Sequence, residues 1–108
     1  MIEISIKSSN NLYNITLSGH ANYAPAGKDI VCAAVSVLIE TLIAETDGKP
    51  FISHFTHETK PDKTKICFEY NPFITETAAV IHCIETGLKG VADTYPDNVK
   101  ITKKVFGN

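Results

Sequence analysis

The chain has 108 residues, of which 44% are hydrophobic and 20% are charged. This length supports one modest hydrophobic core, so we expect a single domain spanning residues 1–108. All ten basic residues are lysines, and twelve acidic residues leave a formal net charge of −2. The hydrophobic content and small net charge exclude a disordered chain. The lack of arginine and of a basic surface argues against direct binding to nucleic acid.

The cysteines and the N-terminus indicate the compartment. Cys32, Cys67 and Cys83 cannot all pair within one chain, and no CxxC spacing occurs, so a disulfide scaffold is not expected. The first six residues contain an acid where a signal peptide would carry basic residues. The apolar run 30–39 is ended by Glu40, which is too early for a membrane span. We therefore expect a cytoplasmic protein with free thiols and no membrane partner.

The first half of the chain changes its hydrophobic period. Residues 2–7 and 12–17 alternate apolar and polar side chains around a Ser-Ser-Asn-Asn turn, which predicts an antiparallel hairpin. Residues 18–28 contain two glycines, a proline and small residues, so we expect a connecting loop. A helical period then runs from Asp29, a favourable N-cap, to Asp47-Gly48. Its expected apolar stripe comprises Ile30, Val31, Ala34, Val35, Leu38, Leu42 and Ile43.

The second half begins with another predicted hairpin. Residues 51–58 and 65–70 are rich in aromatic residues and isoleucine, and residues 59–63 have the composition of a turn. A mixed helical period predicts a helix over 75–92 after the break at Asn71-Pro72. Residues that follow this period are Ala78, Ala79, Ile81, His82, Ile84, Glu85, Leu88 and Val91.

The last predicted element completes the fold class. Residues 99–105 alternate apolar and polar side chains, and their lysines suit a strand at a sheet edge. The resulting order ββαββαβ predicts an α+β domain in which two helices cover one face of a mostly antiparallel sheet. Phosphate-binding loops, EF-hands and HExxH motifs do not occur in the sequence, so no cofactor and no metal is expected.

Cys32 carries the strongest local chemical signal. With Asp29 as N-cap, Cys32 occupies the third helical position, where free N–H groups and the helix dipole favour a thiolate. The negative charge of Asp29 in the same turn opposes that anion, and capping is its expected role. The alternative interpretation makes Cys32 a small, inert residue packed on an alanine-rich helix face.

His20 is the candidate base for this thiol. It lies where the second predicted strand enters the 18–28 loop, so packing of the hairpin against the helix brings it toward Cys32. Gly19 beside it leaves room for the backbone of a peptide. Ser36 follows Cys32 by one helical turn and is a candidate to orient the pair. The alternatives are a structural or surface histidine and a serine bonded back to its own helix.

The remaining histidines and cysteines point to no second site. His54 and His57 form an HxxH, but on a strand this spacing directs the two side chains to opposite faces, so we expect surface residues. His82 and Cys83 are adjacent on the predicted second helix, and Cys67 lies within a predicted strand. We interpret these three as packing residues, with a metal site as a distant alternative.

Three segments resemble the ribosomal-processing cysteine proteases called Prp. Residues 18–21 (SGHA) and 27–36 (GKDIVCAAVS) together are much more specific than a lone cysteine and histidine. Tyr95-Pro96-Asp97 before the last predicted strand also resembles that family. The length and element order of the family match the whole chain, while the distinctive residues are concentrated in 18–36.

The resemblance implies a small bacterial cytoplasmic endopeptidase, often homodimeric, that is needed for ribosome assembly. It implies removal of the short N-terminal extension of ribosomal protein twenty-seven of the large subunit, with cleavage after a pair of aromatic residues. The catalytic histidine and cysteine of the family correspond to His20 and Cys32, and its motif aspartate and serine to Asp29 and Ser36. We expect free N–H groups at the helix start, including that of Cys32, to stabilise the oxyanion.

The chain departs from the family pattern at two positions. Asn22 stands where glycine is common, and Asn98 stands where an aromatic residue is usual. Because Gly27 and several small residues remain in the 21–28 loop, we still expect a mobile lid. Two alternatives to the protease remain: a noncatalytic ribosome-associated adaptor that binds the peptide, and a small structural domain with an inert cysteine.

Overall fold

The computed structural model describes residues 1–107, and its element order is ββαββαβ as predicted. The elements are β1 (Ile2–Ser8), β2 (Leu12–Ser18), α1 (Ile30–Thr46), β3 (Ile52–Lys60), β4 (Lys63–Tyr70), α2 (Thr75–Thr94) and β5 (Val99–Val105). The second hairpin is longer than expected. Its strands extend into the predicted 59–63 turn, because Pro61 and Asp62 suffice to reverse the chain.

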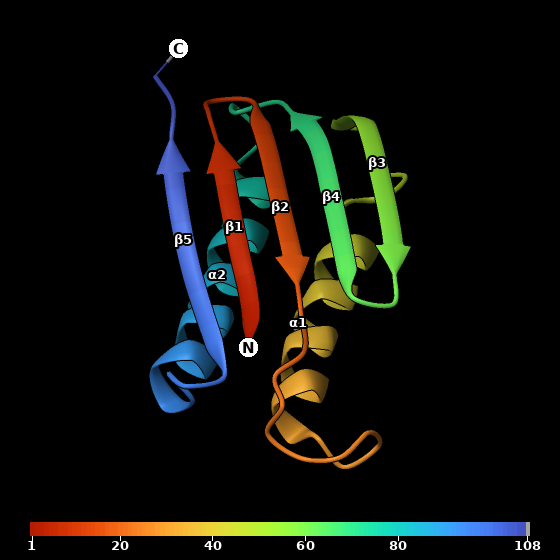
Figure 1. Cartoon of the computed structure of the whole chain (residues 1–108). Coiled ribbons are helices and arrows are strands. Elements are labelled where there is room, and N and C mark those ends of the chain that lie inside the picture. Colours follow the sequence, from red (N-terminus) through yellow and green to blue (C-terminus); the bar gives the residue numbers. More distant parts are fainter. Residues whose placement is uncertain (108) are drawn as a thin grey trace.

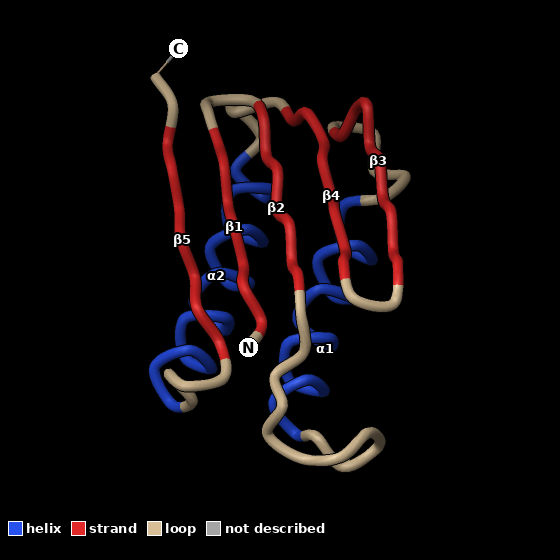
Figure 2. The backbone as a smooth tube through the Cα atoms, in the orientation of Figure 1, coloured by secondary structure: helices blue, strands red, loops and turns tan. Residues whose placement is uncertain are grey.

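The sheet has the strand order β3-β4-β2-β1-β5, with both helices on one face (Figures 1 and 2). All neighbouring pairs are antiparallel except β1 and β5, which run parallel after the α2 crossover. The α+β prediction is therefore confirmed, and β5 lies at an edge as its lysines indicate. Within residues 1–107, neither helix combines the length and the hydropathy that a membrane crossing requires.

Alternation along the strands places the core between the sheet and the helices. The inward side chains of β1 are the three isoleucines at 2, 4 and 6, while Glu3 and Lys7 point to the open face. The core is completed by Tyr13, Ile15 and Leu17 of β2, Ile66 and Phe68 of β4, and Val99 of β5. The open face of the sheet is consequently polar.

The fully buried stripes of the helices are narrower than predicted, although the predicted residues Leu38, Ile43 and Val91 pack against the core while partly exposed. α1 buries Val31, Val35, Ile39, Leu42 and Thr46, and α2 buries Thr77, Ile81, Ile84 and Leu88. The prediction that Ile30 faces the core is wrong, because this residue lies one helical step from Val31 and is 55% exposed. His82 and Cys83 are likewise exposed rather than packed, since Ile81 and Ile84 take the inward positions on α2.

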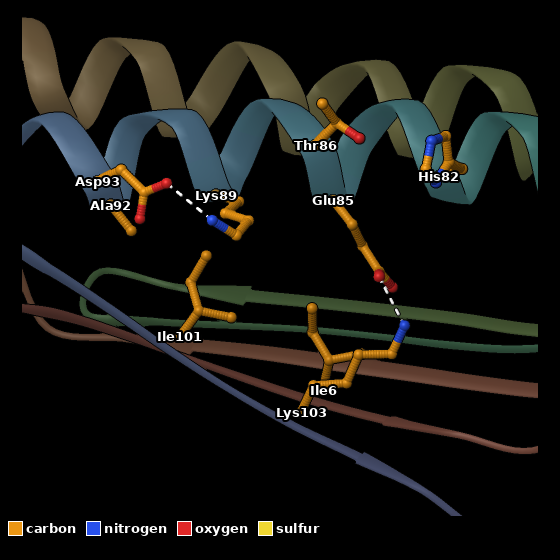
Figure 3. Close-up of a pocket in the computed structure, with 9 residues that line it drawn as sticks. All are labelled: Ile6, His82, Glu85, Thr86, Lys89, Ala92, Asp93, Ile101 and Lys103. Atoms are coloured by element: carbon orange, nitrogen blue, oxygen red, sulfur yellow. Dashed lines mark hydrogen bonds and ion pairs between the residues drawn. The ribbon is translucent and has the colours of Figure 1, made fainter.

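A polar contact crosses the core between the sheet and α2. The Tyr13 hydroxyl donates to Glu85 Oε2 at 2.8 Å, and Lys103 Nζ lies 2.6 Å from Glu85 Oε1. Figure 3 shows Lys103 reaching from β5 up to Glu85 on α2. Burial, and then the neighbouring Glu85 carboxylate, raise the pKa of Tyr13 above its ordinary value. Tyr13 therefore keeps its proton in the folded state.

Replacing Tyr13 with phenylalanine tests this contact. At pH 7, Tyr13→Phe should lower the free energy of unfolding by about 1–2 kcal/mol, because the half-buried Glu85 loses a hydrogen bond. Above about pH 10, unfolded tyrosine loses a proton that folded Tyr13 retains, so wild-type stability falls by up to about 1.4 kcal/mol per pH unit. Urea unfolding at pH 7 and at pH 11 measures both effects.

Between pH 7 and pH 11, Tyr13→Phe should lose less of its free energy of unfolding than wild type, because it lacks the Tyr13 phenol. Tyr23→Phe is the matched control, because the Tyr23 side chain is 48% exposed. Identical alkaline losses in wild type and Tyr13→Phe would contradict the role given to the buried phenol.

Candidate active site

The predicted site residues gather at one end of the sheet. There β2 runs into the 19–29 loop, α1 begins, and the turn after α2 leads into β5 (Figures 1 and 2). Backbone hydrogen bonds add two further segments. Gly19 N–H donates to Asp62 O, in the β3–β4 turn, at 2.9 Å, and Ile2 N–H, at the start of β1, donates to Asn98 O at 2.8 Å. Several segments that are distant in sequence thus meet at this end of the domain.

Asp29 caps α1, as predicted, and also binds the loop that precedes it. Its Oδ1 accepts the N–H groups of Val31 and Cys32, both at 3.0 Å. Its Oδ2 accepts the N–H groups of Tyr23 at 3.0 Å and Ala24 at 3.3 Å. These hydrogen bonds lower the pKa of Asp29 below its ordinary value, and the bond from the Cys32 N–H has the largest effect. One ionised carboxylate therefore holds both the helix start and the loop.

This cap changes the expected source of oxyanion stabilisation. The sequence predicted a free N–H at Cys32. This prediction is wrong, because the Cys32 N–H donates to Asp29 Oδ1. Val31 N–H uses the same oxygen, and Ala33 N–H donates to Asp29 O at 3.1 Å. A well-capped helix start satisfies its own donors, and sequence alone does not show how many remain available.

The sulfur of Cys32 instead meets a backbone donor from the loop. Cys32 is half-buried, and its Sγ accepts the Ala21 N–H at 3.4 Å. Ala21 is 1% exposed, so this peptide group is enclosed by the core rather than placed on a free loop. This donor is not predicted from the sequence. The one local feature that favours it is the small residue Ala21 next to His20, which permits a close approach of the backbone to the sulfur.

The structure brings His20, Cys32 and Ser36 together. All three line a cavity of about 620 Å³ under the 19–29 loop. The same three line a second cavity of about 200 Å³ toward the β3–β4 turn. His20 and Ser36 are exposed, so both are accessible from solvent. Among the hydrogen bonds of residues 1–107, none joins His20 to Cys32 directly. Catalytic hydrogen bonds are often long in unliganded enzymes.

Gly19 is required by the path of the backbone. Its φ is +86°, a left-handed conformation that favours glycine, and a Cβ at this position would clash with the Met1 carbonyl oxygen. The turn at Gly19 directs His20 toward the cavities that it shares with Cys32. The glycine therefore contributes to the site through the conformation of its backbone.

The two departures from the family pattern both have structural roles. Asn22 adopts a positive φ of 56°, a left-handed conformation that glycine favours and that asparagine tolerates better than most residues. Asn98 Nδ2 donates to Ala21 O at 2.9 Å. In addition, the Tyr23 ring packs edge-on against Tyr95 with centroids 5.2 Å apart. These contacts attach the first part of the loop to the turn before β5.

Other polar groups of the described chain lie apart from this site. His54 Nδ1 is 2.7 Å from Glu69 Oε2, whereas His57 Nε2 lies 2.7 Å from Thr59 Oγ1, so the two histidines have different partners. A bulge between Ser53 and Thr56 interrupts the alternation that the sequence argument assumed. Within residues 1–107, no three histidine, cysteine or acidic side chains cluster as metal ligands would.

A separate cavity of about 490 Å³ lies between α2 and β5 (Figure 3). Its charged side chains pair with one another, Lys89 with Asp93 at 2.8 Å and Lys103 with Glu85 at 2.6 Å. The residues that line it include His82 but no cysteine. It therefore lacks the thiol that the cavities around Cys32 contain.

Comparison with known proteins identifies the family. A family model for cysteine protease Prp matches residues 1–100. The ribosomal processing cysteine protease Prp of Mycoplasma genitalium is 32% identical over 108 residues, which cover 98% of this chain and 99% of that relative. The match therefore spans the whole domain and includes the segment from Gly19 to Ser36.

Solved structures show the same fold. The essential ribosomal processing protease Prp from S. aureus, in complex with a covalently linked product peptide, has a TM-score of 0.82 at 18% identity, covering 96% of this chain and all of that one. SMU.848 from Streptococcus mutans has a TM-score of 0.66 at 21% identity, covering 100% of this chain and 96% of its own. The chain is a cysteine protease and belongs to the Prp family.

Proposed function

We propose that the protein removes the short N-terminal extension of ribosomal protein twenty-seven of the large subunit, using Cys32 and His20 as a catalytic dyad. The observation that carries the proposal is that both side chains line the same two cavities, with Cys32 in the first turn of α1. The curated relative is a ribosomal processing protease, and solved structures of the S. aureus protein contain a substrate peptide and a covalently linked product peptide.

The proposed reaction proceeds through an acyl-enzyme. Cys32 Sγ attacks the scissile carbonyl carbon while its proton passes to His20, and the carbonyl oxygen takes up the negative charge. When the tetrahedral intermediate collapses, the C–N bond breaks and the proton on His20 passes to the leaving amine. His20 then takes a proton from water, whose oxygen attacks the thioester carbonyl. Release of the new carboxyl group returns the proton to the thiolate.

The geometry suits a peptide that crosses Cys32 in an extended conformation. The 620 Å³ cavity lies on the loop side of the sulfur, and the 200 Å³ cavity lies on the side of the β3–β4 turn. The two cavities thus provide space for substrate residues on both sides of the scissile bond. The aromatic pair that precedes the cut would bring large apolar side chains, which gain the most from such cavities.

We assign supporting roles to three neighbours of the dyad. Asp29 positions the loop and the helix start through its four backbone hydrogen bonds. Gly19 permits the turn that directs His20, and the Ser36 hydroxyl, exposed in both cavities, orients the bound peptide or the imidazole. The part of the 21–28 loop that follows Ala21 is the proposed lid over the peptide, because Ala21 itself is enclosed by the core. No cofactor enters this mechanism.

Substituting the dyad tests the proposed reaction. A synthetic peptide carrying the extension and its aromatic pair should be cut by wild type and by Cys83→Ala, whose exposed thiol lies on α2. Cys32→Ala and His20→Ala should reduce kcat by at least about 10³-fold, because the nucleophile or its base is missing. Chromatography with mass detection of both fragments measures the rates.

Several outcomes would contradict this assignment. Equal cutting by Cys32→Ala would remove the cysteine from the reaction, and cutting by His20→Ala at the wild-type rate would remove the histidine. If wild type binds the peptide but never cuts it, the noncatalytic adaptor becomes the better description. Binding of the peptide by Cys32→Ala is expected, because most contacts with the peptide do not involve the sulfur.

Asp29 offers a test that separates helix capping from binding of the loop. Asp29→Asn keeps one oxygen to cap α1, but its amide NH₂ cannot accept from Tyr23 and Ala24. It should lower kcat/KM about tenfold with little loss of stability. Asp29→Ala should also lower the free energy of unfolding by about 1 kcal/mol, since the cap is lost. Equal destabilisation by both variants would contradict this division of roles.

We also infer that the protein is cytoplasmic and works as a homodimer, as the resemblance implies. Analytical ultracentrifugation at micromolar concentration should give twice the mass of the chain. A sedimenting species with the mass of one chain at this concentration would contradict the homodimer.

A further inference from the structure

Asn98 is held rigidly beside the site by its own backbone. Its N–H donates to Tyr95 O at 2.9 Å, and its carbonyl oxygen accepts the N–H of Ile2 at 2.8 Å. These bonds link the end of α2, the start of β5 and the start of β1. Because they involve backbone atoms, they do not depend on the side-chain amide of Asn98. The side chain therefore projects from a fixed base.

The side-chain amide of Asn98 reaches the residue that follows His20. Asn98 Nδ2 donates to the carbonyl oxygen of Ala21 at 2.9 Å, and the contact is partly buried. Ala21 itself is 1% exposed. Its methyl group is enclosed by the core while its carbonyl is held by Asn98, so this residue has two independent restraints.

The other polar group of Ala21 faces the nucleophile. Its N–H donates to Cys32 Sγ at 3.4 Å. The N–H groups of Val31, Cys32 and Ala33 are occupied by Asp29, so they do not serve the sulfur in this arrangement. The N–H of Ala21 is thus the backbone donor that the described structure directs at Cys32 Sγ.

We propose that Asn98 is a positioning residue of the protease site, which holds Ala21 so that its N–H stabilises negative charge at Cys32. This donor stabilises the negative charge that develops on the sulfur as its proton passes to His20. During attack the charge passes to the carbonyl oxygen, which is then bonded through carbon to the same sulfur and lies near the same N–H. The proposal rests on the proposed roles of His20 and Cys32, and it adds a residue from the opposite end of the sequence.

The chemical requirement explains why an amide suits position 98. The acceptor is a carbonyl oxygen, so the partner must donate a hydrogen bond. Aspartate at position 98 has almost the same shape but presents a carboxylate oxygen to the Ala21 oxygen. Alanine removes the side-chain contact without adding charge. The two substitutions together separate loss of the donor from the effect of a new charge.

The experiment measures catalysis and thiol reactivity in Asn98→Asp and Asn98→Ala. Asn11→Asp is the matched control, because it makes the same chemical change in the β1–β2 turn at the other end of the sheet, where its Oδ1 can still accept from Ser9. Peptide cleavage gives kcat and KM. Alkylation by iodoacetamide at neutral pH, followed by peptide mass spectrometry, gives separate rates for Cys32 and for exposed Cys83.

Both Asn98 variants should lose at least about tenfold in kcat while KM stays within about twofold. Alkylation of Cys32 should slow at least about threefold, whereas alkylation of Cys83 should be unchanged. Asn11→Asp should match wild type in all measurements. Thermal unfolding of each variant verifies that the compared proteins are folded at the assay temperature.

The proposal is overturned if folded Asn98→Ala retains wild-type kcat and wild-type alkylation of Cys32. It is also overturned if KM rises while kcat is unchanged, since Asn98 would then contact the peptide rather than position the site. A wrong substrate assignment gives a different result. Wild type would then not cut the peptide, while the alkylation rates would still show whether Asn98 acts on Cys32.

Discussion

One carboxylate organises the active end of this domain. Asp29 accepts four backbone N–H groups, two from the first turn of α1 and two from the loop that follows β2. The start of the helix and the loop carrying His20 are thereby held relative to each other. Because the same helix turn contains Cys32, the position of this proposed nucleophile and the path of the loop depend on a single side chain. The cavities beside Cys32 follow from this arrangement.

The cap also decides which groups remain for chemistry. A helix start is usually a source of free N–H donors, but here Asp29 occupies those of Val31 and Cys32. Stabilisation of negative charge at the sulfur is then left to a donor outside the helix. Ala21 supplies it, and Asn98 holds Ala21 from the far end of the chain. The protease site is consequently built by both halves of the sequence.

Local patterns predicted most of the fold and part of the site. Alternation along β1 and β2, and the N-cap at Asp29, are encoded within a few residues, so both were predicted correctly. His20 and Cys32 line the same two cavities, which is consistent with the short loop between them. The features that were not predicted depend on the rotation of a helix about its axis or on contacts between distant residues. The exposure of Ile30 and Cys83 depends on which side of each helix faces the core. The hydrogen bond from Asn98 to Ala21 joins residues 77 positions apart.

Direct detection of the acyl-enzyme tests the central claim that Cys32 at this junction is the nucleophile. Protein mixed with the aromatic-site peptide and quenched in acid within milliseconds can be weighed intact and then mapped by mass spectrometry. We expect one adduct on Cys32, with the mass of the N-terminal fragment less one water molecule, and none in His20→Ala on the same timescale. Cleavage without an adduct on Cys32, or with the adduct on Cys67 or Cys83, would contradict it.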